Sequence, residues 1–199
     1  MWLHDLKLIL ADRIIENGSL RIENGTIAEI VESSGAPSGF TAFPGYIDMH
    51  GDMIELELEP RPKVGFPMEV AVAHLDARLA AAGVTTAYAA VSFSRSAKDG
   101  DRRSFEHTSN IIRALKENVQ GLRVDHRIHA RFDMTYTDAI SALEGLLVAG
   151  VVDLVSVMDH TPGQGQYRSV EKLISYRVRG GSSEEQARAE IQNRMENAV

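Results

Sequence analysis

Residues 43–52 read Phe-Pro-Gly-Tyr-Ile-Asp-Met-His-Gly-Asp, and they decide the fold expected for this chain. The Pro-Gly pair predicts a turn, and the apolar residues after it predict a short strand that runs into a histidine and a carboxylate. Side chains alternate between the two faces of a strand, so His50 and Asp52 are expected on the same face. An imidazole beside a carboxylate supplies two ligands for zinc or a transition metal. The alternative is a turn with one exposed histidine and one capping aspartate.

The rest of the chain alternates helical and strand patterns. Apolar spacing predicts helices over residues 67–82, 105–119 and 137–149, and a polar helix over 182–198. Strands are predicted over residues 84–91, 127–133 and 151–160. Strands that alternate with helices indicate an α/β fold with a parallel sheet. A full eight-stranded barrel needs about 250 residues, so four strands indicate either a compact doubly wound sheet or the first half of a barrel.

The first 42 residues have a different pattern. Asn17-Gly18 and Asn24-Gly25 each lie between strand-like segments, which is a strong hairpin signal. Residues 33–39 are rich in Ser, Gly and Pro and predict a loop. We therefore expect a small β unit over residues 1–42 and an α/β unit over residues 43–199.

Composition narrows the classes of function. The net charge of −7 argues against a general nucleic-acid-binding protein. The chain has no cysteine, so any metal must be held by histidine and carboxylate. No apolar run is long enough to span a membrane, and no signal peptide is recognisable at the N-terminus. We expect a cytoplasmic location.

The carboxyl ends of parallel strands usually carry the functional site. Three predicted strands end in residues that can bind metal or phosphate: His50 and Asp52; His129, Arg131 and Asp133; and Asp159 and His160. An arginine on such a face suits a phosphate oxygen. His160 is a candidate metal ligand or proton carrier, and the sequence leaves both roles open.

Two loops add candidate substrate-binding groups. Gly163 and Gly165 would let backbone amides approach an anion. Arg61 and Lys63 follow the metal motif and either meet a polyphosphate or are solvated loop charges.

Residues 44–52 resemble the first barrel strand of the amidohydrolase superfamily, which more often carries His-x-His. The His-x-Asp form followed by residues 57–62, Glu-Leu-Glu-Pro-Arg-Pro, resembles one family in particular. That family is the ribose methylphosphonate triphosphate diphosphatases of the bacterial carbon–phosphorus lyase pathway. Residues 158–164, Met-Asp-His-Thr-Pro-Gly-Gln, resemble its second signature. Residues 129–133 resemble its third-strand segment, in which the last position is more usually glutamate.

The resemblance implies the first four βα units of a TIM-like barrel, preceded by a small β-sandwich segment. It implies hydrolysis of α-D-ribose 1-methylphosphonate 5-triphosphate to the 5-phosphate and pyrophosphate. One or two divalent ions would assist, namely zinc or alternatively manganese or iron. The roles implied are metal binding by His50, Asp52 and Asp133, catalysis by His160, and substrate binding by Arg61, Arg131, Gly163 and Gln164.

Later strands of this family supply a further histidine ligand and an aspartate that acts as general base. We therefore expect a chain of 199 residues to be a truncated product, a fragment or one half of a split enzyme. Its expected partners are a phosphorylated small molecule and either a second copy or a chain that supplies the remaining strands. Two alternatives stay open: another amidohydrolase activity, such as amide hydrolysis or deamination, and a non-catalytic half-barrel that binds a partner chain.

Overall fold

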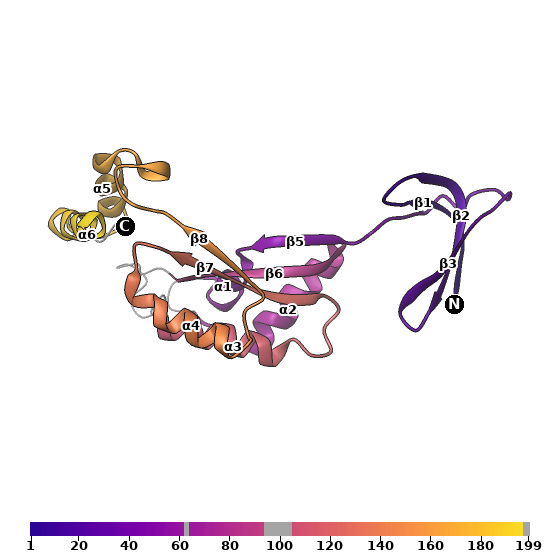
Figure 1. Ribbon diagram of the computed structural model, residues 1–199, viewed down its shortest axis with the longest axis horizontal. Coiled ribbons are helices and arrows are strands. Elements are labelled where there is room, and N and C mark those ends of the chain that lie inside the picture. The colour runs from indigo at the N-terminus through magenta and orange to yellow at the C-terminus, as the bar shows by residue number, and fades with distance from the viewer. Residues whose placement is uncertain (62–63, 94–104, 197–199) are drawn as a thin grey trace. The chain divides into compact units, whose positions relative to one another are not determined.

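The computed structural model describes residues 1–61, 64–93 and 105–196, except the side chains of His107 and Asp138. The chain divides into two compact units, Met1–Tyr46 and Ile47–Val199 (Figure 1). No helix in the described ranges is long and apolar enough to cross a membrane.

The N-terminal unit is a four-stranded mixed sheet in the order β3-β2-β1-β4. Its strands are β1 (Trp2–Ile9), β2 (Ile14–Glu23), β3 (Thr26–Glu32) and β4 (Thr41–Ala42). β2 pairs antiparallel with both β1 and β3, whereas β4 pairs parallel with β1. The core of this sheet is small and is centred on Leu8, Ile15 and Leu20.

The two Asn-Gly pairs of this unit have different roles. Asn24 and Gly25 have φ angles of 49° and 76° and form the turn between β2 and β3. Asn17 and Gly18 instead lie inside β2, where its register with β1 shifts, so the hairpin turn predicted there is wrong. A Cβ atom on Gly18 would lie 2.7 Å from Cδ1 of Leu8, so glycine serves close packing at this position.

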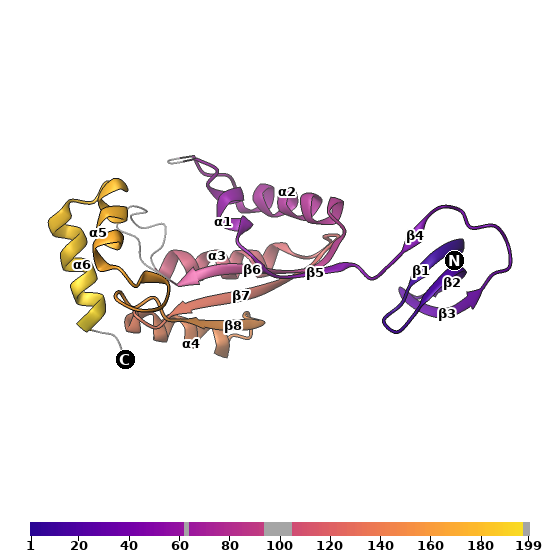
Figure 2. The ribbon, with the colours of Figure 1, turned by 90° about the horizontal axis from the view of Figure 1, so that it is seen from above.

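The second unit contains a sheet in the order β5-β6-β7-β8. Its strands are β5 (Tyr46–Gly51), β6 (Val84–Phe93), β7 (Asp125–Asp133) and β8 (Leu154–Met158). β7 pairs parallel with both β6 and β8. The helices α2 (Met68–Ala81), α3 (Phe105–Asn118) and α4 (Ile140–Val148) alternate with the strands and cover one face of the sheet (Figures 1 and 2). A doubly wound sheet would carry helices on both faces, so this curled sheet has the half-barrel arrangement.

Two helices were not predicted from the sequence. α1 (Met53–Leu58) follows the His-x-Asp motif and is too short to show a helical period. α5 (Val170–Arg179) begins after Ser169, whose hydroxyl accepts a hydrogen bond from the Lys172 N–H. The predicted C-terminal helix is present as α6 (Glu184–Glu196).

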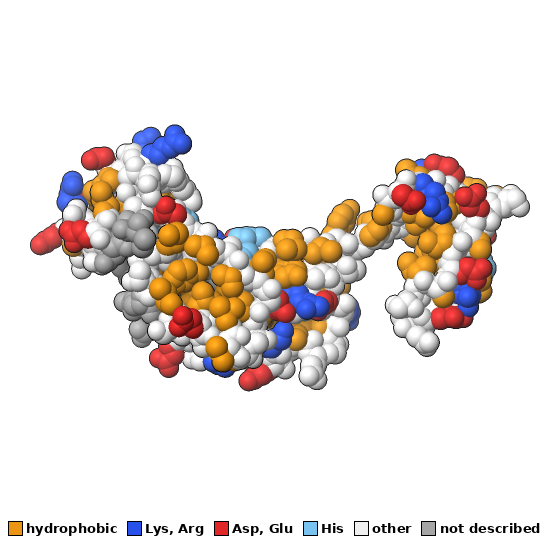
Figure 3. Space-filling view, viewed as in Figure 1, with side chains coloured by type: hydrophobic (Ala, Val, Ile, Leu, Met, Phe, Trp, Pro, Cys, Tyr) orange, Lys and Arg blue, Asp and Glu red, His pale blue; other side chains and the backbone are white. Residues whose placement is uncertain are grey.

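The core of this unit lies between the sheet and its covering helices. Alternate residues of β7, Ile128 and Ala130, pack there with buried side chains of β6 and α3, among them Val91, Phe93, Ile112 and Leu115. The residues that alternate with these on β7, namely His129, Arg131 and Asp133, face the other side of the sheet. Hydrophobic side chains also gather on the surface over β8 and α4 (Figure 3), where Val157 and Val148 are exposed.

Candidate functional site

His50 and Asp52 converge at the end of β5. Nε2 of His50 lies 3.7 Å from Oδ1 of Asp52, and both side chains are largely open to solvent. The backbone N–H of His50 donates to Oδ1 of Asp48 at 3.0 Å, which holds the strand end before α1 begins. Zinc ligands lie about 2.0–2.2 Å from the ion, so this separation suits two ligands of one ion.

Arg131 on β7 joins this pair. Its Nη1 donates to Oδ1 of Asp52 at 2.5 Å, so the two predicted site residues form an ion pair. Its Nε is buried and has no hydrogen-bond partner in the part of the chain that the structure describes. A buried N–H of this kind is satisfied when it meets an acceptor such as water or a ligand oxygen.

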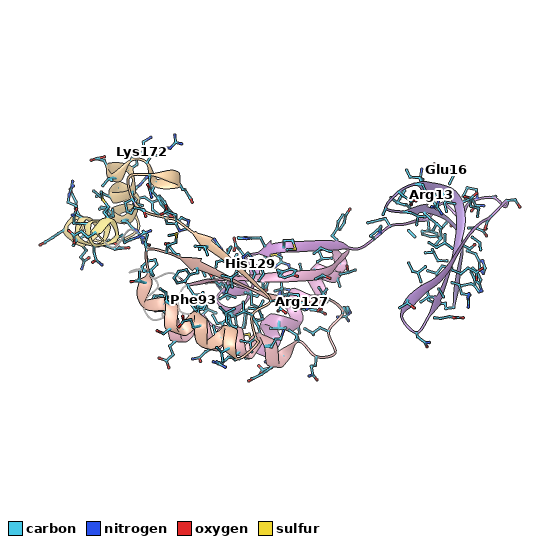
Figure 4. All side chains as sticks on the ribbon, in the orientation of Figure 1. Arg13, Glu16, Phe93, Arg127, His129 and Lys172 are labelled. Atoms are coloured by element: carbon cyan, nitrogen blue, oxygen red, sulfur yellow. The ribbon has the colours of Figure 1, made fainter. Side chains whose placement is uncertain are left out.

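His129, which the sequence placed among the strand-end residues that can bind metal or phosphate, lies beside His50. The two rings meet edge to face with centroids 5.0 Å apart (His129 is labelled in Figure 4). Nδ1 of His129 is 3.2 Å from the Met49 carbonyl, and Nε2 is 2.8 Å from Oγ of Ser156. Burial lowers the pKa of His129, so the neutral ring donates from Nδ1 and accepts the Ser156 hydroxyl at Nε2. Both ring nitrogens are therefore occupied within the protein.

Asp133 belongs to a separate group of contacts. Its Oδ1 accepts from the N–H and the hydroxyl of Thr135, and its Oδ2 lies 2.9 Å from Nδ1 of His160. Among the described residues, no three His, Asp or Glu side chains lie close enough together to hold a metal ion. The structure thus brings His50 and Asp52 together, but it does not bring Asp133 to them.

The loop after β8 is held by its own hydrogen bonds. The N–H of Thr161 and Nε2 of Gln164 donate to the Asp159 carboxylate, at 2.9 Å and 2.8 Å. These hydrogen bonds lower the pKa of Asp159, and those from Thr161 have the largest effect. The Gly163 N–H donates to the Tyr167 carbonyl at 2.9 Å. The predicted substrate groups Gly163 and Gln164 are therefore both engaged within the loop.

Arg61 lies exposed in a short turn, where its backbone pairs with Val64. Within the described ranges, the Arg61 side chain makes no hydrogen bond or ion pair with the other predicted site residues. Lys63, the second cation predicted to meet phosphate, lies outside the described residues.

Comparison with known proteins supports the resemblance read from the motifs. No protein-family model matches the chain. Over 184 residues the chain is 35% identical to the alpha-D-ribose 1-methylphosphonate 5-triphosphate diphosphatase of Escherichia coli (strain K12). The alignment covers 88% of this chain and 48% of the relative, so the chain spans about half the length of that protein.

Proposed function

We propose that this chain acts as a hydrolase of phosphonate metabolism. Its proposed substrate is alpha-D-ribose 1-methylphosphonate 5-triphosphate, which is cleaved to the 5-phosphate and pyrophosphate. The observation that carries the proposal is the 35% identity, over 88% of this chain, to a diphosphatase named for this substrate. The half-barrel sheet supports it, since β5 to β8 follow one another in sequence with their helices on one face. In this proposal they are the first four βα units of an amidohydrolase barrel.

His50 and Asp52 are the proposed metal ligands of this hydrolase. Their 3.7 Å separation and exposure leave room for a divalent ion, with zinc, manganese and iron as candidates. A bound divalent ion supplies Lewis-acid activation of water and of a phosphoryl oxygen. Asp133 is a poorer ligand in this conformation because both of its oxygens already accept hydrogen bonds.

Arg131 is the proposed phosphate-binding group. Its guanidinium already lies against Asp52, next to the proposed metal position. Its buried Nε has no acceptor in the described part of the chain, and a phosphate oxygen would supply one. A metal ion and an arginine on one phosphate stabilise the charge that develops on its oxygens during hydrolysis.

Pyrophosphate release from the named substrate tests this function. The purified chain is loaded with zinc or manganese, and metal binding is measured separately by calorimetry. We expect pyrophosphate from the unaltered chain, a loss of at least about 100-fold in His50→Ala, and full activity in His4→Ala, whose histidine lies in the N-terminal sheet. Metal binding without any pyrophosphate would contradict the proposed reaction. Ammonia released from amide or amino substrates would instead support another amidohydrolase activity.

A further inference from the structure

Glu57 of α1 binds two side chains of α2. Its Oε2 lies 2.6 Å from Nδ1 of His74, and its Oε1 accepts a hydrogen bond from Nη1 of Arg78. His74 and Arg78 lie four positions apart on α2, so the two donors reach the carboxylate from the same face of that helix. Only 10% of the Glu57 side chain is exposed, whereas 62% of His74 and 54% of Arg78 are exposed. Both oxygens of a nearly buried carboxylate are therefore fixed by the neighbouring helix.

The position of α1 depends on contacts of this kind. The helix has six residues, and a helix of that length is not stable in isolation. Its two buried side chains are Ile54 and Glu57, which lie three positions apart and so share a face. Ile54 packs in the hydrophobic core, and such packing has no preferred direction. The hydrogen bonds of Glu57 are directional, so they fix how α1 is placed against α2.

Asp52 is the residue at which the sheet meets α1. It follows Gly51, the last residue of β5, and it is the N-cap of α1. An N-cap aspartate commonly accepts a hydrogen bond from its own helix, but the Asp52 side chain makes no such bond. Its Oδ1 instead lies 3.7 Å from Nε2 of His50 and accepts from Nη1 of Arg131. The place of Asp52 therefore depends on where α1 packs.

His50 and Arg131 are held by the sheet. His50 lies in β5, next to β6 in the sheet order, and its backbone N–H donates to Asp48. Arg131 lies in β7, which is paired on both sides, with β6 and with β8. A shift of α1 would therefore move Asp52 relative to two neighbours that stay in place.

We propose that Glu57 is a positioning residue for the proposed metal site. By holding α1 against α2, it keeps Asp52 within reach of His50 and Arg131. The inference rests on the proposed function, in which His50 and Asp52 bind a divalent ion. Glu57 acts through Asp52 and is not a ligand itself, because both of its oxygens already accept hydrogen bonds from α2.

The first test needs neither metal nor turnover. Nitrogen-15 spectra of the arginine guanidinium groups in the full chain report the ion pair of Arg131 with Asp52, with Arg131→Lys identifying its signals. We expect hindered rotation of the Arg131 guanidinium in the unaltered chain and free rotation in Glu57→Ala. The matched control is Glu190→Ala, which removes a glutamate that joins α6 to α5 through Arg177. We expect this control to leave the Arg131 signals unchanged.

The second test measures zinc binding by calorimetry. We expect Glu57→Ala to weaken zinc binding by about 10-fold, because one of the two ligands is displaced. Glu57→Gln keeps the shape and one acceptor oxygen, so we expect a smaller loss. Ile54→Val trims the apolar contact of the same helix and leaves the hydrogen bonds in place. We expect it to lower the free energy of unfolding but to change zinc affinity by less than about twofold.

The outcomes separate the two proposals. Unchanged Arg131 signals in folded Glu57→Ala, or in folded Glu57→Gln if alanine unfolds the chain, would overturn the positioning role. Equal weakening of zinc binding in the Glu57 variant and in Ile54→Val would overturn it as well, since general loosening of α1 would then explain the loss. Absence of zinc binding by the unaltered chain would instead refute the proposed metal site, and the Arg131 spectra would still decide whether Glu57 positions Asp52.

Discussion

Nη1 of Arg131 lies 2.5 Å from Oδ1 of Asp52, across 79 positions of the sequence. The residue predicted to bind phosphate is thus paired with a residue predicted to bind metal. An arginine in this position competes with a cation for the carboxylate and also offers a positive charge to an anion.

Arg131→Ala should therefore strengthen the binding of a divalent metal ion and weaken the binding of pyrophosphate. Removal of the guanidinium frees Asp52, so we expect divalent zinc or manganese to bind about two- to fivefold more tightly, the range expected for an exposed ion pair. We expect pyrophosphate to bind more weakly, because it loses a donor. Calorimetric titration of each ligand measures both changes. The matched control is Arg127→Ala, an arginine of the same strand that pairs with Asp125 and Asp153. Equal changes in the two variants would refute the competition.

Asp76 supports the second unit from α2, and it was not singled out from the sequence. Its carboxylate is 1% exposed and accepts from the backbone N–H groups of Arg123 and Val124, each at 3.0 Å, and from His126 at 3.2 Å. Burial acts to raise the pKa of Asp76, but the hydrogen bonds outweigh it and hold the pKa below its ordinary value of 3.8. The stabilisation is therefore present above about pH 4 and lost as pH falls through the folded-state pKa.

Asp76→Asn should remove this acid dependence. At pH 7 the amide loses part of the hydrogen bonding to Arg123, Val124 and His126, so we expect the free energy of unfolding to fall by about 2 kcal/mol. As pH falls below about 4 the difference from the unaltered chain should shrink, and it should be smallest below the folded-state pKa of Asp76, where both proteins lack the ionised group. Urea unfolding followed by circular dichroism at several pH values measures this. Asp125→Asn alters an exposed aspartate of β7 and should show neither effect.

Gly18→Ala should destabilise the N-terminal sheet. The added Cβ would lie 2.7 Å from Cδ1 of Leu8 and 3.0 Å from the Val31 carbonyl, so the Leu8 side chain and the backbone of β3 must both shift. We expect a loss of about 1–3 kcal/mol. The only tryptophan of the chain, Trp2, lies in β1, so its fluorescence reports unfolding of this unit. Gly35→Ala, whose nearest contact would be 3.6 Å, should change stability by less than about 0.5 kcal/mol.

Ser156→Ala should weaken the second unit through His129. The Ser156 hydroxyl is the group within hydrogen-bond distance of Nε2 of His129, at 2.8 Å, and the ring is buried. Loss of this donor leaves a buried acceptor unpaired, at a cost of about 1–2 kcal/mol in the free energy of unfolding. As a control, Ser109→Ala removes a hydroxyl that donates to the Phe105 carbonyl within α3. We expect it to change the free energy of unfolding, measured by chemical denaturation, very little.

Local sequence patterns were sufficient to predict much of the fold. Alternating apolar runs predicted β6, β7 and β8 and the helices between them, because such periods depend only on neighbouring residues. Local patterns did not predict the structure at the first Asn-Gly pair correctly. The same dipeptide forms a turn at Asn24 and lies inside a strand at Asn17, because Leu8 packs against Gly18 from another strand.

For the site, the sequence by itself determined that His50 and Asp52 lie together, since two positions separate them along the chain. It also determined which residues of β7 share a face. Only the tertiary structure decided what those residues meet. Arg131 reaches Asp52, and Asp133 meets His160 while Arg194 bonds Thr135 from 59 positions away. The physical reason is that spacing orients a side chain, whereas its partner depends on how distant elements pack.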